Sequence, residues 1–160
     1  SSGVNSSTRA IFAGGGNPGT VNTIQYVTIG STGNATDFGD LTIVKQFTAG
    51  VSSSTRGVIS GGNSTPVSPT NVIDYITIAS TGDATDFGDM TTIFDDSIIM
   101  GVNNSVRGIF SGICAPSAGA RSTIMEYITI ATTSDTVDFG DLTVATNSGA
   151  GTSDGHGGLQ

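Results

Sequence analysis

The segment ATDFGDLT occupies residues 35–42, and two close copies follow it, ATDFGDMT at 84–91 and TVDFGDLT at 136–143. Recurrence of one segment along a chain of 160 residues indicates a repeat protein. Each copy follows a run rich in β-branched residues and tyrosine, a composition that suits a strand on a pleated sheet. The Asp-Phe-Gly-Asp (DFGD) motif is therefore predicted to be a structural part that the chain makes three times.

Other residues recur in phase with DFGD. An arginine stands near the start of each repeat, a tyrosine lies in its most β-prone run, and DFGD follows. The residues that share these positions are Arg9, Arg56 and Arg107; Tyr26, Tyr75 and Tyr127; Asp37, Phe38 and Asp40; Asp86, Phe87 and Asp89; and Asp138, Phe139 and Asp141. We divide the chain into repeat units 5–51, 52–102 and 103–152, with 153–160 as a tail that continues in the phase of the repeat.

The pattern predicts a single all-β domain over 1–160. Each unit offers about four strands in roughly 50 residues, which is the size of a propeller blade. In unit two these are RGVISGG, VIDYITIA, MTTIF after DFGD, and a looser stretch that ends at Val102. The strand around Tyr75 is mostly apolar on both faces, so we expect sheets to cover it on both sides. A threefold β-prism or β-trefoil is the alternative architecture.

The repeated residues have structural explanations. The phenylalanines are expected to anchor the core, and Gly39, Gly88 and Gly140 to permit a bend or bulge. The aspartates are expected to accept backbone N–H groups. Because three of the five basic residues share one repeat position, we expect each arginine to form a partly buried pair with a DFGD carboxylate. On this hypothesis Arg56→Ala destabilises the protein far more than Lys45→Ala.

Catalytic and metal sites are not expected. The kinase triplet Asp-Phe-Gly needs an HRD loop and a strand lysine, which are absent from the sequence. Two aspartates three residues apart on a strand point to opposite faces, which disfavours a calcium site. We assign no catalytic residue and no cofactor: Cys114 is read as an apolar filler, His156 as part of a terminal turn, and the pair Asp95–Asp96 as a solvated turn.

Charge and hydropathy disfavour two kinds of partner, nucleic acid and the interior of a membrane. The chain carries 13 acidic and five basic residues, a formal charge of −8, which disfavours nucleic acid because phosphate binding needs clustered Lys and Arg. No apolar run approaches the length of a membrane span. A homo-oligomer or a complex with other proteins is expected.

Several phrases resemble a known family. STRGVISGG, NVIDYITIASTGDATDFGDMT and the closing GHGGLQ are similar to tandem repeats of virion structural proteins from marine tailed phages, especially cyanophages. Those repeats are in turn similar to kelch motifs, whose double glycine, tyrosine, aromatic and arginine correspond here to Gly61-Gly62, Tyr75, Phe87 and Arg56. Phe stands where kelch repeats usually have Trp.

The resemblance implies a function. It implies a non-enzymatic virion appendage, such as a tail fibre, knob or capsid decoration, located on the extracellular particle. Such a protein would present loops to the host surface, whose ligand would be a polysaccharide. A purely structural, filament-forming repeat protein and a glycan-degrading enzyme are the alternatives.

Overall fold

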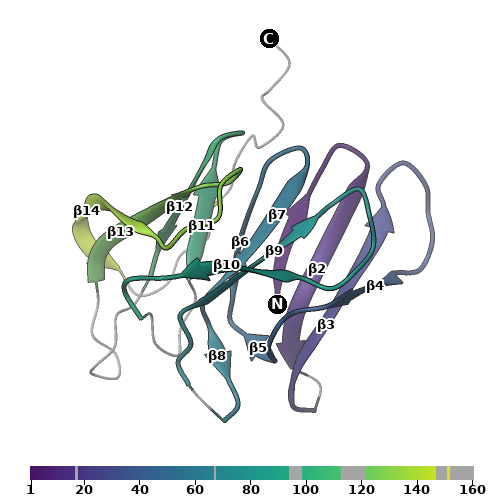
Figure 1. The fold of residues 1–160 in the computed structure, drawn as a ribbon, viewed down its shortest axis with the longest axis horizontal. Helices are drawn as coiled ribbons and strands as arrows, with labels where there is room; N and C mark the ends of the chain where they lie inside the picture. The colour runs from purple at the N-terminus through teal and green to yellow at the C-terminus, as the bar shows by residue number, and fades with distance from the viewer. Residues whose placement is uncertain (17, 67, 94–98, 113–121, 147–150, 152–160) are drawn as a thin grey trace.

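The computed structural model describes residues 1–16, 18–66, 68–93, 99–112, 122–146 and 151. Within these ranges every regular element is a β-strand, and no helix is present, so no described helix is long and apolar enough to cross a membrane. Figure 1 shows the strands gathered into sheets that stand side by side. The prediction of an all-β fold is confirmed.

Three antiparallel sheets of four strands each account for most of the described chain. The first consists of β1 (Ser2–Asn5), β2 (Arg9–Gly16), β3 (Thr20–Thr28) and β4 (Thr36–Asp40); the second of β6 (Ala49–Ser52), β7 (Arg56–Ser60), β9 (Val72–Thr77) and β10 (Thr85–Asp89); the third of β11 (Met100–Asn103), β12 (Arg107–Ser111), β13 (Ser122–Thr129) and β14 (Val137–Thr146). Strands that follow one another in the chain are neighbours in each sheet. The short strands β5 (Lys45–Gln46) and β8 (Asn63–Ser64) pair separately and link the segment after the first sheet to the second.

The strand boundaries differ from the predicted ones in two ways. The predicted units end at Val51 and Val102, inside β6 and β11, and each of these strands pairs with the strand that follows it. The DFGD motif was expected to precede the next strand, but it is itself the outer strand of each sheet. The reason is the glycine of DFGD, which lets the strand bulge and stay paired, so that Leu41 and Met90 can turn into the core.

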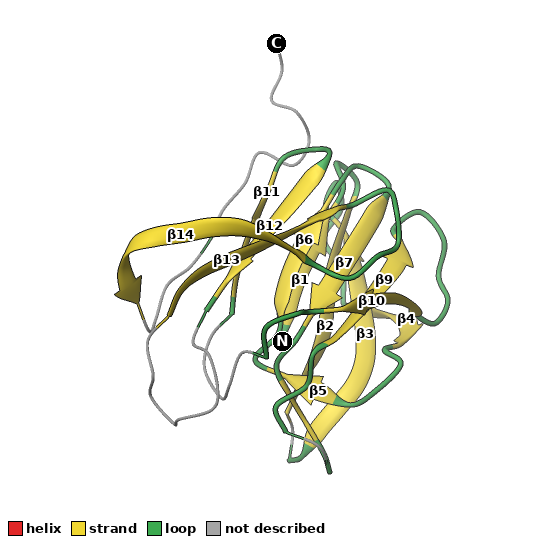
Figure 2. Ribbon diagram, turned by 60° about the vertical axis from the view of Figure 1, so that its left-hand side comes forward, coloured by secondary structure: helices red, strands yellow, loops and turns green. Residues whose placement is uncertain are grey.

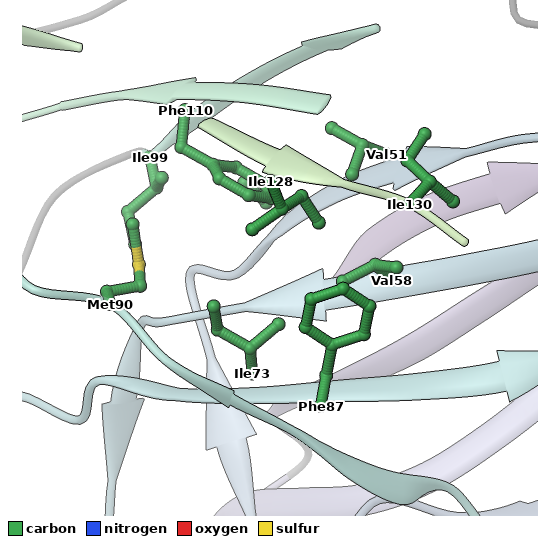
Figure 3. Close-up of a cluster of buried hydrophobic side chains, with 10 residues drawn as sticks. Val51, Val58, Ile73, Phe87, Met90, Ile99, Phe110, Ile128 and Ile130 are labelled. Atoms are coloured by element: carbon green, nitrogen blue, oxygen red, sulfur yellow. The ribbon is translucent and has the colours of Figure 1, made fainter. Parts of the chain in front are cut away.

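The second sheet lies between the other two and is covered on both faces, as expected from its sequence. Figure 2 shows the sheets from another side, with β6 next to both β1 and β11. One core cluster lies between the first and second sheets and includes Phe38 and Ile59. The other lies between the second and third sheets, where Phe87 faces Phe110 and Ile128 (Figure 3).

Glycines allow the first strands of the three sheets, β1, β6 and β11, to approach one another closely at what we call the inner edge of the sheets. A Cβ atom on Gly50 of β6 would lie 2.7 Å from the carbonyl oxygen of Gly3, and one on Gly101 of β11 would lie 2.8 Å from that of Gly50. Both distances are shorter than a carbon and an oxygen tolerate, so any larger residue would push the sheets apart. The inner edges of consecutive sheets are thus packed in the same way.

Candidate functional site

The repeated arginine, tyrosine and phenylalanine form one stack in every sheet. The guanidinium carbon lies over the tyrosine ring, and the tyrosine meets the phenylalanine edge to face. The distances to the tyrosine centroid are 4.7 Å for Arg9 and Tyr26, 4.4 Å for Arg56 and Tyr75, and 4.5 Å for Arg107 and Tyr127. The tyrosine and phenylalanine centroids are 5.9, 6.0 and 5.9 Å apart in the same order, within the usual range for aromatic pairs. The stack stabilises each sheet through a cation–π interaction and apolar contact.

The predicted pairing of arginine with DFGD carboxylates is wrong. Arg9 Nη1 donates to the carbonyl oxygen of Ile78 at 2.9 Å, and Arg56 Nη1 donates to that of Ile130 at 3.1 Å. Each acceptor comes directly after a strand of the following sheet, Ile78 after β9 and Ile130 after β13. All six DFGD aspartates are exposed, and no arginine–carboxylate ion pair occurs among the described residues. The guanidinium therefore joins one sheet to the backbone of the next and leaves the carboxylates in water.

The DFGD motif forms a β-bulge in which the phenylalanine is the extra residue. The following glycine has a φ of +144° at Gly39, +142° at Gly88 and +126° at Gly140, a conformation that disfavours side chains. A Cβ on Gly88 would also lie 2.5 Å from the carbonyl oxygen of Ser134. In the first two sheets the glycine is thus needed both for its backbone angle and for the approach of the next sheet, and in the third sheet for its backbone angle alone.

In the second and third sheets, the turn before the outer strand is hydrogen-bonded to the bulge of the preceding sheet. Ala84 N donates to Asp40 O at 2.8 Å, and Thr136 N donates to Asp89 O at 2.9 Å. The carboxylates of Asp83 and Asp135 accept the amides of Asp40 and Asp89 at 3.0 and 2.9 Å. The DFGD aspartates were expected to accept such amides, but among the described residues only Asp138 does so, from the amide of Gly140.

A buried ion pair between Lys45 and Asp74 was not predicted. Lys45 Nζ lies 2.8 Å from Asp74 Oδ2, both side chains are fully buried, and Nζ also donates to the carbonyl oxygens of Ile59 and Val72. Thr42 donates to the other carboxylate oxygen. Burial lowers the pKa of Lys45 below its usual value, while the Asp74 carboxylate opposes part of that shift. Lys45 is therefore unsuitable as the surface control that the sequence suggested.

The third sheet carries a different buried acid at the same repeat position. Glu126 is almost fully buried and accepts hydrogen bonds from the hydroxyls of Thr91 and Thr136, each at 2.6 Å. The first sheet has the exposed Gln25 there. The three sheets thus use this position differently: its side chain is ion-paired in the second sheet, bonded to two threonines in the third and exposed in the first.

A groove lies at the loop ends of the first and second sheets. It has a volume of about 540 Å³ and lies between the segment after β4, the loop between β8 and β9, and the segment after β10. Its lining is apolar or uncharged: Ile43, Val44, Ser64, Thr65, Pro66, Pro69, Thr70, Asn71, Val72 and Ile93. None of the residues at the repeated arginine, tyrosine or DFGD positions lines it.

No cluster of three metal-binding side chains occurs among the described residues. Cys114, His156, Asp95 and Asp96 lie outside the described residues.

Comparisons with known proteins concern the fold alone. No family model and no curated protein matches the sequence. Solved structures of similar fold include one described as "Structure of YjhT", with a TM-score of 0.66 and 8% sequence identity over 88% of this chain. The chain spans about half of that protein, 51% of its length.

Proposed function

We propose that the three sheets are consecutive blades of a β-propeller, and that the protein is a non-enzymatic component of a phage virion appendage that presents loops to the host surface. The serial contacts support the blade interpretation, because the second sheet packs against the first and the third through equivalent residues. A threefold prism or trefoil would bring each sheet against both others. The fold likeness to YjhT is consistent with this arrangement. The virion assignment is supported by the resemblance of the repeats.

The groove is the observation that carries the binding function. None of the repeated arginine, tyrosine or DFGD side chains lines the groove, whereas most of its lining comes from segments that connect strands, among them Val44, Pro66 and Pro69. Binding residues commonly lie on loops that a rigid scaffold positions. Ile93 remains 44% exposed beside two prolines, so apolar surface is available for a ligand.

The lining favours a neutral ligand with both apolar and hydroxyl surfaces. Thr65 and Asn71 offer hydrogen-bonding groups next to the apolar walls of Val44 and Pro69, and no charged side chain lines the groove. A formal charge of −8 also repels anionic ligands. A neutral host polysaccharide, with sugar C–H faces against the apolar wall and hydroxyls against the amide and hydroxyl groups, meets these conditions.

Binding to cyanobacterial cells, and to polysaccharide purified from their surface, tests this function. Val44→Asp and Ile93→Asp place a charge in the groove and should weaken retention at least about tenfold. Val106→Asp is the matched control, because Val106 is 60% exposed in the turn between β11 and β12, at the opposite strand ends. Groove variants that bind like the wild type would contradict the proposal.

The enzymatic alternative is tested with the same polysaccharide. The protein should release no reducing ends, and Asp95→Asn together with Asp96→Asn should leave that background unchanged. Turnover that these substitutions abolish would replace a binding role with glycan hydrolysis.

A further inference from the structure

The outer face of the third sheet exposes side chains that are buried in the first two sheets. Val102 is 36% exposed, whereas its counterparts Val4 and Val51 are 4% and 1% exposed. Phe139 is 42% exposed, and its counterparts are both 2% exposed. In the first two sheets the following sheet covers these positions. The third sheet therefore presents the surface of a sheet-to-sheet contact, and of the residues described after its last strand only Gly151 lies against it.

This outer face contains a hollow at the place that the following sheet fills in the first two sheets. It has a volume of about 330 Å³ and is lined by Val102, Asn103, Asn104, Arg107, Ile109 and Phe139. In the first two sheets the following sheet sets an isoleucine carbonyl, Ile78 O or Ile130 O, against the repeated arginine. The described residues include no sheet beyond the third that could supply such a carbonyl to Arg107.

The opposite face of the first sheet exposes the complementary residues. Phe12 is 50% exposed and Ile29 is 52% exposed. Their counterparts Ile59 and Ile78 are at most 1% exposed, because they pack against the preceding sheet. The free face of the first sheet thus has the residues that pack against a preceding sheet, and the outer face of the third sheet has those that a following sheet covers.

We propose that the outer face of the third sheet binds the free face of the first sheet of a second copy of this chain, head to tail. In this contact Phe12 and Ile29 of the second copy would cover Val102 and Phe139. The carbonyl oxygen of Ile29 would accept a hydrogen bond from the guanidinium of Arg107. This inference rests on the blade arrangement proposed above and not on ligand binding. Continuity with the two contacts inside the chain carries it.

The number of blades and the charge of the free face favour a second copy of the chain as the occupant of this face. Two copies would place six blades in a ring, within the 4–8 that propellers usually have, and a head-to-tail contact closes when the rotation per blade allows it. The matched 88% of this chain corresponds to 51% of YjhT, so the matched parts of two copies together have about the length of that protein. Where the second and third sheets have Asp74 and Glu126, the free face has the neutral Gln25, so docking would bury no unpaired acid there.

Two glycine positions define the fit at the inner edge. A Cβ on Gly151 would lie 2.3 Å from the carbonyl oxygen of Gly101, the relation that Gly50 has to Gly3, so the face accepts a glycine main chain at this position. Gly3 of the second copy would take the place of Gly151. Ala10 departs from the pattern, because a Cβ at the equivalent Gly57 would lie 2.6 Å from Cγ2 of Val4. Ala10→Gly should therefore tighten association.

Sedimentation of the full chain over a range of concentrations tests the contact. The wild type should form a dimer, Ala10→Gly should dimerise several-fold more tightly, and Phe12→Asp and Phe139→Asp should each weaken dimerisation about 30-fold or more. Each single variant retains one intact face. An equimolar mixture of the two should therefore associate better than either alone, which a contact of one face with itself would not produce.

Controls separate this contact from folding and from the groove. Val106→Asp should dimerise like the wild type, because its counterparts Thr8 and Thr55 are exposed even in covered sheets. Val44→Asp should also dimerise normally, so a failure of ligand binding remains distinguishable. Circular dichroism verifies that each variant is folded. A wild type that stays monomeric at its highest soluble concentration, oligomers that grow beyond two copies, or a mixture without rescue would overturn the proposal.

Discussion

The second and third sheets carry the same repeated residues in different surroundings. The edge-to-face contact is almost the same in both, with centroids 6.0 Å apart for Tyr75 and Phe87 and 5.9 Å apart for Tyr127 and Phe139. Burial differs strongly: Phe87 is 2% exposed and Phe139 is 42% exposed. The motif therefore forms its contacts within a sheet by itself, but it becomes core only where another sheet follows.

The largest effect is expected where the second sheet buries a charge pair. Lys45→Met leaves the Asp74 carboxylate buried without its cation and should lower the free energy of unfolding by about 3–5 kcal/mol. At the equivalent position of the third sheet, Glu126→Gln keeps groups that can bond the two threonine hydroxyls and should cost only about 1 kcal/mol. Urea unfolding of both variants measures the difference.

A double substitution serves as the control for this prediction. Lys45→Met combined with Asp74→Asn removes both charges and keeps an acceptor for Thr42, so it should recover most of the lost stability. If Lys45→Met were as mild as Glu126→Gln, burial of the pair would not matter energetically.

The next effect compares the two phenylalanines directly. Phe87→Ala empties a position in the core and should cost about 3–5 kcal/mol. Phe139→Ala should cost about 1–2 kcal/mol, since much of its ring already contacts water. Chemical denaturation at a concentration where the chain is monomeric gives both values, with Phe38→Ala expected to match Phe87→Ala. Equal losses at Phe87 and Phe139 would remove the distinction between covered and open sheets.

The bulge glycines give a smaller difference. Gly88→Ala and Gly140→Ala both place a side chain at a positive φ, which costs of order 1–3 kcal/mol in each case. Only Gly88 also faces the carbonyl oxygen of Ser134, whereas a Cβ on Gly140 would have no neighbour within 4 Å. Gly88→Ala should thus be the more destabilising by about 1–3 kcal/mol in thermal or urea unfolding. The reverse order would show that the backbone angle alone decides the cost.

The smallest difference is expected at the arginines. Arg56→Met and Arg107→Met both lose the stack on tyrosine, but only Arg56 donates to the backbone of the next sheet. Arg56→Met should cost about 1 kcal/mol more than Arg107→Met in the same unfolding assay. Both should be milder than Lys45→Met, which reverses the order expected from sequence. A larger loss at Arg107 would contradict the inter-sheet role of the guanidinium.

The features that follow from local pattern were predictable from sequence. β-branched runs and glycine pairs indicated strands, and recurrence of DFGD indicated three equivalent sites. The two apolar faces around Tyr75 correctly indicated a sheet with cover on both sides. These features depend on residues close together in the chain, so their spacing reveals them.

Partners that lie in different sheets could not be predicted in the same way. The arginine could have bound a carboxylate or a carbonyl, and only the stacking of sheets brings the carbonyl of Ile130 to Arg56. Lys45 and Asp74 meet across the boundary between the first and second sheets. A signal existed, because Lys45 is the only lysine and Asp74 stands within an apolar strand face, but nothing in the repeat joins them.

Amide hydrogen exchange tests most directly whether the repeated turns join each sheet to the preceding one. Ala84 and Thr136 donate their amides across such junctions, at 2.8 and 2.9 Å, whereas Ala35 holds the same repeat position in the first sheet, which no described sheet precedes. In the monomeric protein, the amides of Ala84 and Thr136 should be protected as well as those of the central strands, and that of Ala35 should exchange rapidly. Equally rapid exchange at all three would contradict an architectural role for the repeat.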